Sequence, residues 1–217
     1  MLETGRVRAV PAQVSEEILR ADLENYKQKA LQLGASQAVI IPAQRVEIDE
    51  RARLKCSIPP CGHYGRCGYC PPYTPEPEFM RKALSRFNWA ILFKHDVVPV
   101  EDFSDITRYY PHGEKQQRKT MEIAANIELL ACADGYHFAM GFGAGSCVDS
   151  LCDGKLCKML DSGRCPYILR ARPSMEAVGI DVFGLVNTVG WAIYPCYSSV
   201  DPKSVPSAIS VGIVFIH

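Results

Sequence analysis

Apolar residues recur at helical and strand spacings along most of the chain, and these periods predict its elements. Leu19, Leu23, Tyr26, Ala30 and Leu33 follow one another at steps of four, three, four and three, which predicts an amphipathic helix over 14–34. Similar patterns, with their start and stop signals, predict helices over 74–87, 114–133 and 180–189, and a helix that starts at 173–176. Short runs of apolar and β-branched residues predict strands over 38–42, 46–50, 89–98, 136–140, 191–194 and 209–216.

The order of these elements predicts one domain over residues 1–217. Helices and strands alternate, which favours an α/β fold, with α+β as the alternative, in which helices flank a mixed β-sheet. Two stretches, 56–72 and 145–166, are instead rich in glycine, proline and cysteine, a composition typical of loops. We therefore expect a body of sheet and helices that carries two cysteine-rich, metal-binding loops.

The composition is that of an ordinary globular protein. Apolar residues make up 47% and charged residues 22% of the chain. Lysine plus arginine equals aspartate plus glutamate at 24 each, so no nucleic acid or anionic membrane is indicated as a partner. No apolar run reaches the ~20 residues of a membrane span, and residues 1–11 lack the apolar core of a signal peptide. We expect a cytoplasmic protein, whose clustered cysteines are metal ligands or redox thiols.

Eight of the ten cysteines form two compact sets. The first cysteine block has the spacing C-x4-C-x5-C-x2-C and consists of Cys56, Cys61, Cys67 and Cys70. The second cysteine block has the spacing C-x4-C-x4-C-x7-C and consists of Cys147, Cys152, Cys157 and Cys165. Four thiolates around one centre suit zinc or an iron–sulfur cluster. Each block is therefore a candidate metal centre, while Cys132 and Cys196 are expected to be core thiols.

The spacing within the blocks distinguishes between these two metals. Iron–sulfur ligands are often followed by proline, and both blocks end this way, at Pro71 and Pro166. Zinc sites usually contain two C-x2-4-C pairs. The second block has only longer gaps and favours iron–sulfur over zinc, whereas Cys67-x2-Cys70 leaves the first block open to either metal. His63 could replace a cysteine as a ligand, although the nearby thiols favour a supporting role.

Two other groups of residues near the second block invite a functional interpretation. Gly141, Gly143 and Gly145 follow a predicted strand, but they lack the G-x-G-x-x-G spacing of a nucleotide loop and predict a tight turn beside the metal centre. Arginines also flank the second block, and either compensate the charge of an anionic cluster, dock an acidic partner or lie on the surface. They are Arg164, Arg170 and Arg172.

Longer signatures in and around the blocks resemble the DUF2284 family, described as predicted metal-binding proteins. The resemblance covers the chain from about residue 35 to its end and rests on three segments: Cys61-x2-Tyr64-Gly65-Arg66-x3-Cys70-Pro71-Pro72, Gly145-Ser146-Cys147 through Cys165-Pro166, and Arg172-Pro173-Ser174-Met175-Glu176-Ala177-x-Gly179-Ile180-Asp181-Val182. It implies metal or iron–sulfur binding at Cys56, Cys61, Cys70, Cys147, Cys152, Cys157 and Cys165. Cys67 departs from the family pattern, which would leave a first centre with three cysteines.

Three functional hypotheses follow from these residues. The leading one is an iron–sulfur protein with two [4Fe–4S] clusters that exchanges single electrons with a redox partner protein. The second is an enzyme that uses an open iron in the first block. The third is a binding module in which metals, zinc included, hold two loops in shape. The sequence leaves open whether the protein is an enzyme and what its oligomeric state is.

Overall fold

The structure is a computed structural model and describes residues 7–11, 13–196 and 201–217. Residues 1–6, on which part of the signal-peptide expectation rests, lie outside this range. Within it, no helix is both long enough and apolar enough to span a membrane.

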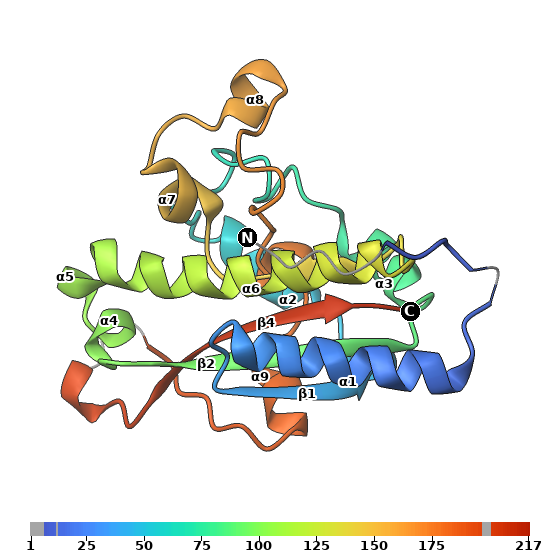
Figure 1. The fold of residues 1–217 in the computed structure, drawn as a ribbon. Helices are drawn as coiled ribbons and strands as arrows, with labels where there is room; N and C mark the ends of the chain where they lie inside the picture. The colour runs from blue at the N-terminus through green and yellow to red at the C-terminus, as the bar shows by residue number, and fades with distance from the viewer. Residues whose placement is uncertain (1–6, 12, 197–200) are drawn as a thin grey trace.

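A four-stranded sheet forms the centre of the fold (Figure 1). Its order is β1-β2-β4-β3, and the strands are β1 (Gln37–Pro42), β2 (Trp89–Val97), β3 (Met140–Phe142) and β4 (Ala208–Phe215). All three strand pairings are antiparallel, with Ala90 opposite Phe215 in the central pair. The two central strands are covered on both faces, which explains why they read as nearly continuous apolar runs.

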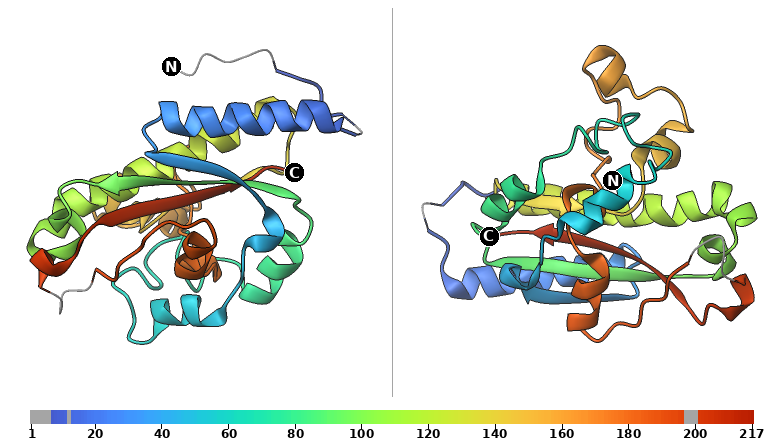
Figure 2. Two further views of the ribbon diagram at one scale, coloured as in Figure 1. Left: turned by 90° about the horizontal axis from the view of Figure 1, so that it is seen from below. Right: turned by 180° about the vertical axis from the view of Figure 1, so that it is seen from behind.

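Helices cover both faces of this sheet (Figure 2). One face packs on α1 (Glu16–Gln32) and α6 (Glu114–Ala133), and the other on α3 (Pro77–Leu84) and α9 (Val182–Thr188). Successive side chains of a strand point to opposite faces, so β2 serves both layers. Ile91 and Phe93 join the core under α1 and α6, while Ala90 and Leu92 join the other core.

The remaining elements are short and connect these layers. The helices are α2 (Glu50–Ser57), α4 (Glu101–Ser104), α5 (Ile106–Arg108), α7 (Cys147–Cys152) and α8 (Lys158–Ser162). There are also short 3-10 helices, η1 (Ala43–Arg45), η3 (Glu176–Val178) and η4 (Pro202–Ser204), and a π-helical turn, η2 (Tyr109–Gly113). Both cysteine blocks lie on the side of α6 that faces away from α1 (Figure 1).

The predicted fold class is confirmed, because helices flank a central sheet in one mixed α/β arrangement. The helix predicted over 114–133 has the same bounds as α6, and the predicted strands 38–42, 89–98 and 209–216 correspond to β1, β2 and β4. The predicted mixture of strand directions is limited to a single parallel bridge between Gly143 and Ser174, since every pairing of the four strands is antiparallel.

Two predicted strands are wrong, a third is displaced, since β3 begins at Met140, and the predicted helix start yields only a short 3-10 helix. The strand predicted over 46–50 is reduced to one bridge, Ile48 with Ile180, because Asp49 then caps α2. Over 136–140 and 191–194 the chain first closes the preceding helix: Tyr136 N–H donates to the Ala131 carbonyl and Trp191 N–H to the Val186 carbonyl. At 173–176 only the short turn η3 forms. Apolar patterning in these stretches reflects burial without strand pairing.

Candidate metal centre

The first cysteine block is a chain of hydrogen-bonded turns. Cys56 lies in the last turn of α2, and the Cys61 N–H donates to its carbonyl at 3.0 Å. The Tyr64 N–H donates to the Cys61 carbonyl, and the Cys70 N–H donates to the Cys67 carbonyl, each at 3.0 Å. The block is therefore held in shape by its own backbone, with a cysteine at the start of each of these three turns.

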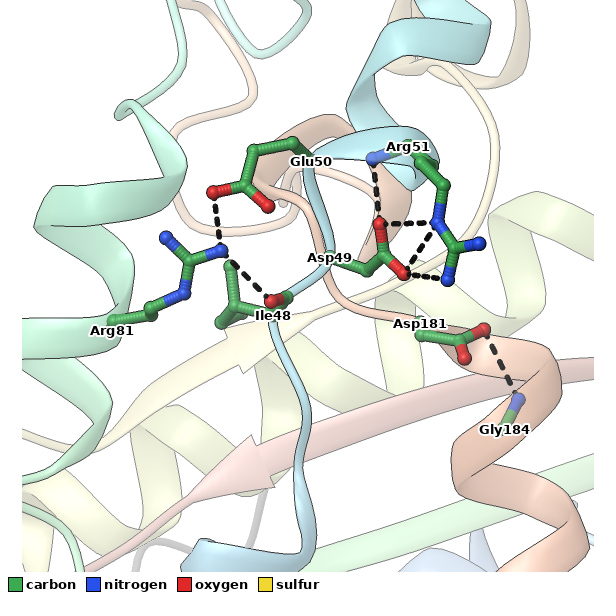
Figure 3. Close-up of polar contacts among 7 residues, drawn as sticks. All are labelled: Ile48, Asp49, Glu50, Arg51, Arg81, Asp181 and Gly184. Atoms are coloured by element: carbon green, nitrogen blue, oxygen red, sulfur yellow. Dashed lines mark hydrogen bonds and ion pairs between the residues drawn. The ribbon is translucent and has the colours of Figure 1, made fainter.

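The helix that carries Cys56 is anchored at its start by polar contacts (Figure 3). Asp49 caps α2 by accepting a hydrogen bond from the Arg51 N–H at 2.8 Å, and the Arg51 side chain lowers the pKa of this carboxyl to about 2. Arg81 of α3 pairs with Glu50 and donates to the Ile48 carbonyl. The neighbouring helix α9 is capped in the same manner, by Asp181 on the Gly184 N–H. These contacts set where α2 begins.

Arg53 connects α2 to the end of the first block. Its buried guanidinium donates to the carbonyls of Thr74 and Pro75 and pairs with Glu76 at 2.7 Å. The Thr74 hydroxyl in turn donates to the Ala177 carbonyl of η3 at 2.6 Å. Both ends of the first block are thus tied to the body of the protein.

The second cysteine block contains two short helices within the segment predicted as a loop. Ser146 caps α7 by accepting a hydrogen bond from the Val148 N–H, which places Cys147 in the first turn and Cys152 at the last residue. Cys157 is the residue that precedes α8, and Gly163 ends that helix in the left-handed conformation at φ 71°. The helices thereby set the direction of three of the four cysteines.

All four cysteines of the second block line one small cavity. Cys147 and Cys157 are buried, while Cys152 and Cys165 are partly exposed. Tyr69 of the first block and Tyr167 complete part of the wall. Across the described ranges, no three His, Cys, Asp or Glu side chains are grouped closely enough to hold a single metal ion. The four thiols line the same small cavity, and they are the donor type that binds iron–sulfur clusters.

The two blocks touch each other. The Cys67 Sγ lies 3.4 Å from the Cys147 Sγ, and the Cys70 thiol donates to the Ser146 hydroxyl at 3.7 Å. The Gly68 N–H donates to the Cys157 Sγ at 3.4 Å. The contact with the Cys147 thiol lowers the pKa of Cys67 and raises that of Cys147.

The contacts divide the first block into two parts. Cys67 and Cys70 join the buried cluster that contains Cys147 and Cys157. Cys56 and Cys61 stay at the end of α2, where burial raises the pKa of Cys56 to about 11 and Cys61 is exposed. The sequence spacing predicts that all four cysteines of the first block bind one metal centre. That grouping stays a prediction, and the structure adds a contact between the blocks.

A contact between the side chains of His63 and Asp149 forms a second link between the blocks. His63 Nε2 lies 2.9 Å from the Asp149 carboxylate of α7, and the His63 N–H donates to the Cys61 Sγ at 3.4 Å. The sequence suggested His63 as a ligand or a supporting residue. The contacts of Asp149 and Ser146 with the first block have no local signal in the sequence, because His63 and Cys70 lie 76 or more residues away along the chain.

The three arginines near the second block have different environments. Arg172 is buried and forms a two-pronged pair with Glu128 of α6, with both N···O distances at 2.7 Å. Arg170 pairs with Glu122 of the same helix, and Arg164 is exposed. Arg172 therefore fastens the segment that follows the second block to α6. Because its side chain is buried, it is neither a surface arginine nor a docking residue.

The two cysteines outside the blocks are only partly buried. Cys132 packs beside the core under α1 and α6, as expected of a core thiol. The Cys196 thiol donates to the Tyr194 carbonyl and lines a cavity that contains none of the eight block cysteines.

Comparison with known proteins identifies one family. The model of DUF2284, described as a predicted metal-binding protein, matches residues 39–215, a range that contains both cysteine blocks and all four strands except the first two residues of β1. No curated protein and no solved structure matches the chain.

Proposed function

Because this chain belongs to the DUF2284 family of predicted metal-binding proteins, we propose that its two cysteine blocks hold iron–sulfur clusters. We further propose that these are two [4Fe–4S] clusters and that the protein exchanges single electrons with a redox partner protein. Clusters of this type supply one-electron chemistry, and the surrounding protein tunes it through ligation, hydrogen bonds and burial. The reducing cytoplasm that we expect would keep the thiols available as ligands.

The observation that carries this proposal is the cavity lined by Cys147, Cys152, Cys157 and Cys165. Four thiols that face one space from two helices and a loop provide the complete ligand set of a [4Fe–4S] cluster. Backbone N–H groups also point at the sulfurs, from Gly68 to Cys157 and from Tyr69 to Cys67. Such hydrogen bonds stabilise thiolates and shift reduction potentials.

The contact between the blocks supports electron exchange between two centres. Cys67 touches Cys147, and Cys70 touches Ser146, the residue next to Cys147. No layer of other residues separates the two ligand sets at this point. An electron donated at one block would therefore have a short path to the other.

The surface around the second block supports a protein partner. Cys165 and Cys152 are partly exposed, so this end of the cavity is near solvent. Large apolar side chains are exposed close by, which is typical of surfaces that contact other proteins. They are Leu156, Met159, Leu160, Ile168 and Leu169, and the helix α8 among them projects from the body (Figure 1).

A second candidate function is catalysis at the first block. Cys67 contacts Cys147 of the second block, and we infer that the other three thiols, Cys56, Cys61 and Cys70, serve the first centre. An iron held by three cysteines can take a further ligand, and the exposure of Cys61 gives access from solvent. This arrangement would make the protein an iron–sulfur enzyme.

The test is the iron and acid-labile sulfide content of the full chain purified without oxygen, together with its visible spectrum. We expect about eight irons and about eight sulfides per chain and a broad absorbance that dithionite bleaches. Cys152→Ser should remove about half of the iron, because Cys152 lines the second cavity.

The matched control is Cys132→Ser, since this thiol on α6 lies outside both blocks and should leave the iron content unchanged. Bound zinc without sulfide or colour would contradict the electron-transfer proposal and favour the zinc-stabilised binding module. Full iron content with a first centre that binds added small ligands would favour the enzyme.

A further inference from the structure

A second cavity of about 250 Å³ lies between β4, η3 and α9. Its wall is mostly apolar and includes the rings of Phe103, Phe183 and Tyr194. None of the eight block cysteines lines it. Its volume is close to the lower end, about 300 Å³, of pockets that hold small organic ligands.

Glu176 supplies the only carboxylate on this wall, as far as the described residues define it. The residue is partly exposed, and burial of its carboxyl raises its pKa. Among the described residues no Lys, Arg or His lines the cavity, and no ion pair is formed by Glu176. An acid in such a place is costly unless a cation joins it.

Three other polar side chains of the wall already make hydrogen bonds within the protein. The Gln117 amide donates to the Tyr109 hydroxyl at 2.6 Å, and the Ser210 hydroxyl is 2.6 Å from the Thr120 hydroxyl. The Cys196 thiol donates to the Tyr194 carbonyl. Glu176 is therefore the group that a ligand would engage.

We propose that this cavity binds a small organic amine as its ammonium ion, with the charge against Glu176 and the apolar body against the aromatic and aliphatic wall. A carboxylate in an apolar pocket attracts a cation, and aromatic faces add a favourable cation–π contribution. A hard metal ion is a poor alternative, since it requires several oxygen ligands and the wall supplies one carboxylate. An anionic ligand would be repelled.

The proposal is independent of the proposed function, because it involves none of the block cysteines. The two sites are nevertheless neighbours, because Gly145 at the cavity wall is two residues before Cys147. Iron content tests the metal centres, and amine binding tests the cavity, so failure of one proposal leaves the other intact.

The test is isothermal titration calorimetry of the full chain, purified without oxygen, with benzylamine as the probe and benzyl alcohol as its neutral isostere. We expect saturable 1:1 binding of benzylamine and binding of the alcohol that is at least tenfold weaker. Glu176→Gln should reduce the benzylamine affinity at least tenfold and leave the weak binding of benzyl alcohol unchanged.

Two further variants complete the design. Glu24→Gln removes an exposed acid from α1 in the opposite layer and should leave both affinities unchanged. Phe183→Leu removes a partly exposed ring at the wall and should weaken benzylamine binding about threefold, so the proposal stays testable if Glu176→Gln does not fold. Equal affinity for the amine and the alcohol, no binding of either, or full benzylamine affinity in folded Glu176→Gln would overturn the proposal.

Discussion

Cys67 is the residue whose position changes the assignment of ligands most. It is completely buried and touches Cys147, although it belongs to the first block in sequence. Cys70, three residues later, also reaches the second block through Ser146. A thiol that faces another block can adjust the electronic environment of that block without binding its metal.

The first prediction separates these two cysteines. Cys70→Ser should lose about half of the roughly eight irons, because Cys70 is expected to be a ligand of the first centre. Cys67→Ser should keep its iron and shift the midpoint potential of the second centre, because the change removes the sulfur beside Cys147. Iron analysis and a redox titration followed by electron paramagnetic resonance measure both effects. An equal loss of iron in the two variants would mean that Cys67 is itself a ligand.

Arg172 and Glu128 form the best-defined buried ion pair near the metal centres. The carboxylate accepts two hydrogen bonds from the guanidinium and one from the Gly141 N–H. The guanidinium also donates to the carbonyls of Ile168 and Ala171. One pair thus ties the exit of the second block, β3 and α6 together.

The second prediction concerns the loss of this pair. Arg172→Met should lower the free energy of unfolding by about 3 kcal/mol, because it leaves the Glu128 carboxylate buried without its partner. Urea unfolding followed by circular dichroism measures the change. The matched control is Lys82→Met in the exposed pair with Glu78, for which we expect at most about 1 kcal/mol. Similar losses in the two variants would show that the Arg172–Glu128 pair stabilises the fold no more than an exposed ion pair does.

At the level of elements, α6 is the support on which the second block is built. The chain from β3 to α7 runs along this helix. Every second residue of this stretch is a glycine, and these glycines, Gly141, Gly143 and Gly145, face α6. A Cβ at Gly141 would lie 3.0 Å from the Ala124 carbonyl oxygen, and one at Gly143 would lie 2.9 Å from the Met121 Cα. The alternating glycines therefore permit close approach of this backbone to the helix.

The third prediction tests this close approach. Gly143→Ala should lower the free energy of unfolding by about 1–3 kcal/mol, because the added methyl group must push the strand away from the Met121 backbone. Thermal unfolding of the variant measures the loss. Gly62→Ala is the control, since no atom lies within 4 Å of its added Cβ, and we expect a change below about 0.5 kcal/mol. An unchanged Gly143→Ala protein would argue against tight packing along α6.

In the molecule as a whole, the two sides of the structure differ in what holds them together. The sheet is covered by two apolar cores, which include Phe93, Phe215 and Ile127. The cysteine blocks form a third, smaller cluster in which half of the buried members are cysteines, with Met121 as the contact to α6. Metal binding and folding are coupled where ligands form the core, so this cluster should depend on metal more than the sheet does.

The fourth prediction follows from that division. Removal of metal by a chelator under reducing conditions should greatly increase amide hydrogen exchange over 56–72 and 145–166. These segments would lose the bonds between the metal and their cysteines. Exchange in β2 and β4 should stay slow, since both strands are buried in the apolar cores. Mass spectrometry of proteolytic peptides provides the measurement. Uniform acceleration across the chain would mean that metal supports the entire fold.

Several features of this protein follow from the sequence by itself. The helical period over 114–133 and the apolar runs of β2 and β4 predict elements that the structure contains, because each depends on burial that repeats along a single segment. The cysteine spacing and the motifs around it indicated a family that the comparison confirms. The strands predicted over 136–140 and 191–194 begin instead with residues that close the preceding helix. An apolar pattern does not reveal which acceptor a backbone N–H will find.

The tertiary structure decided how these local features combine. Cys67 and Cys147 are 80 residues apart, Arg172 and Glu128 are 44 apart, and the cavity of Glu176 draws its wall from segments between Phe103 and Val211. Such contacts depend on how helices and strands pack over long distances along the chain, and no local period encodes them. The residue types of the candidate sites were therefore readable from the sequence, whereas their partners were set by the packing of α6, α7 and the sheet.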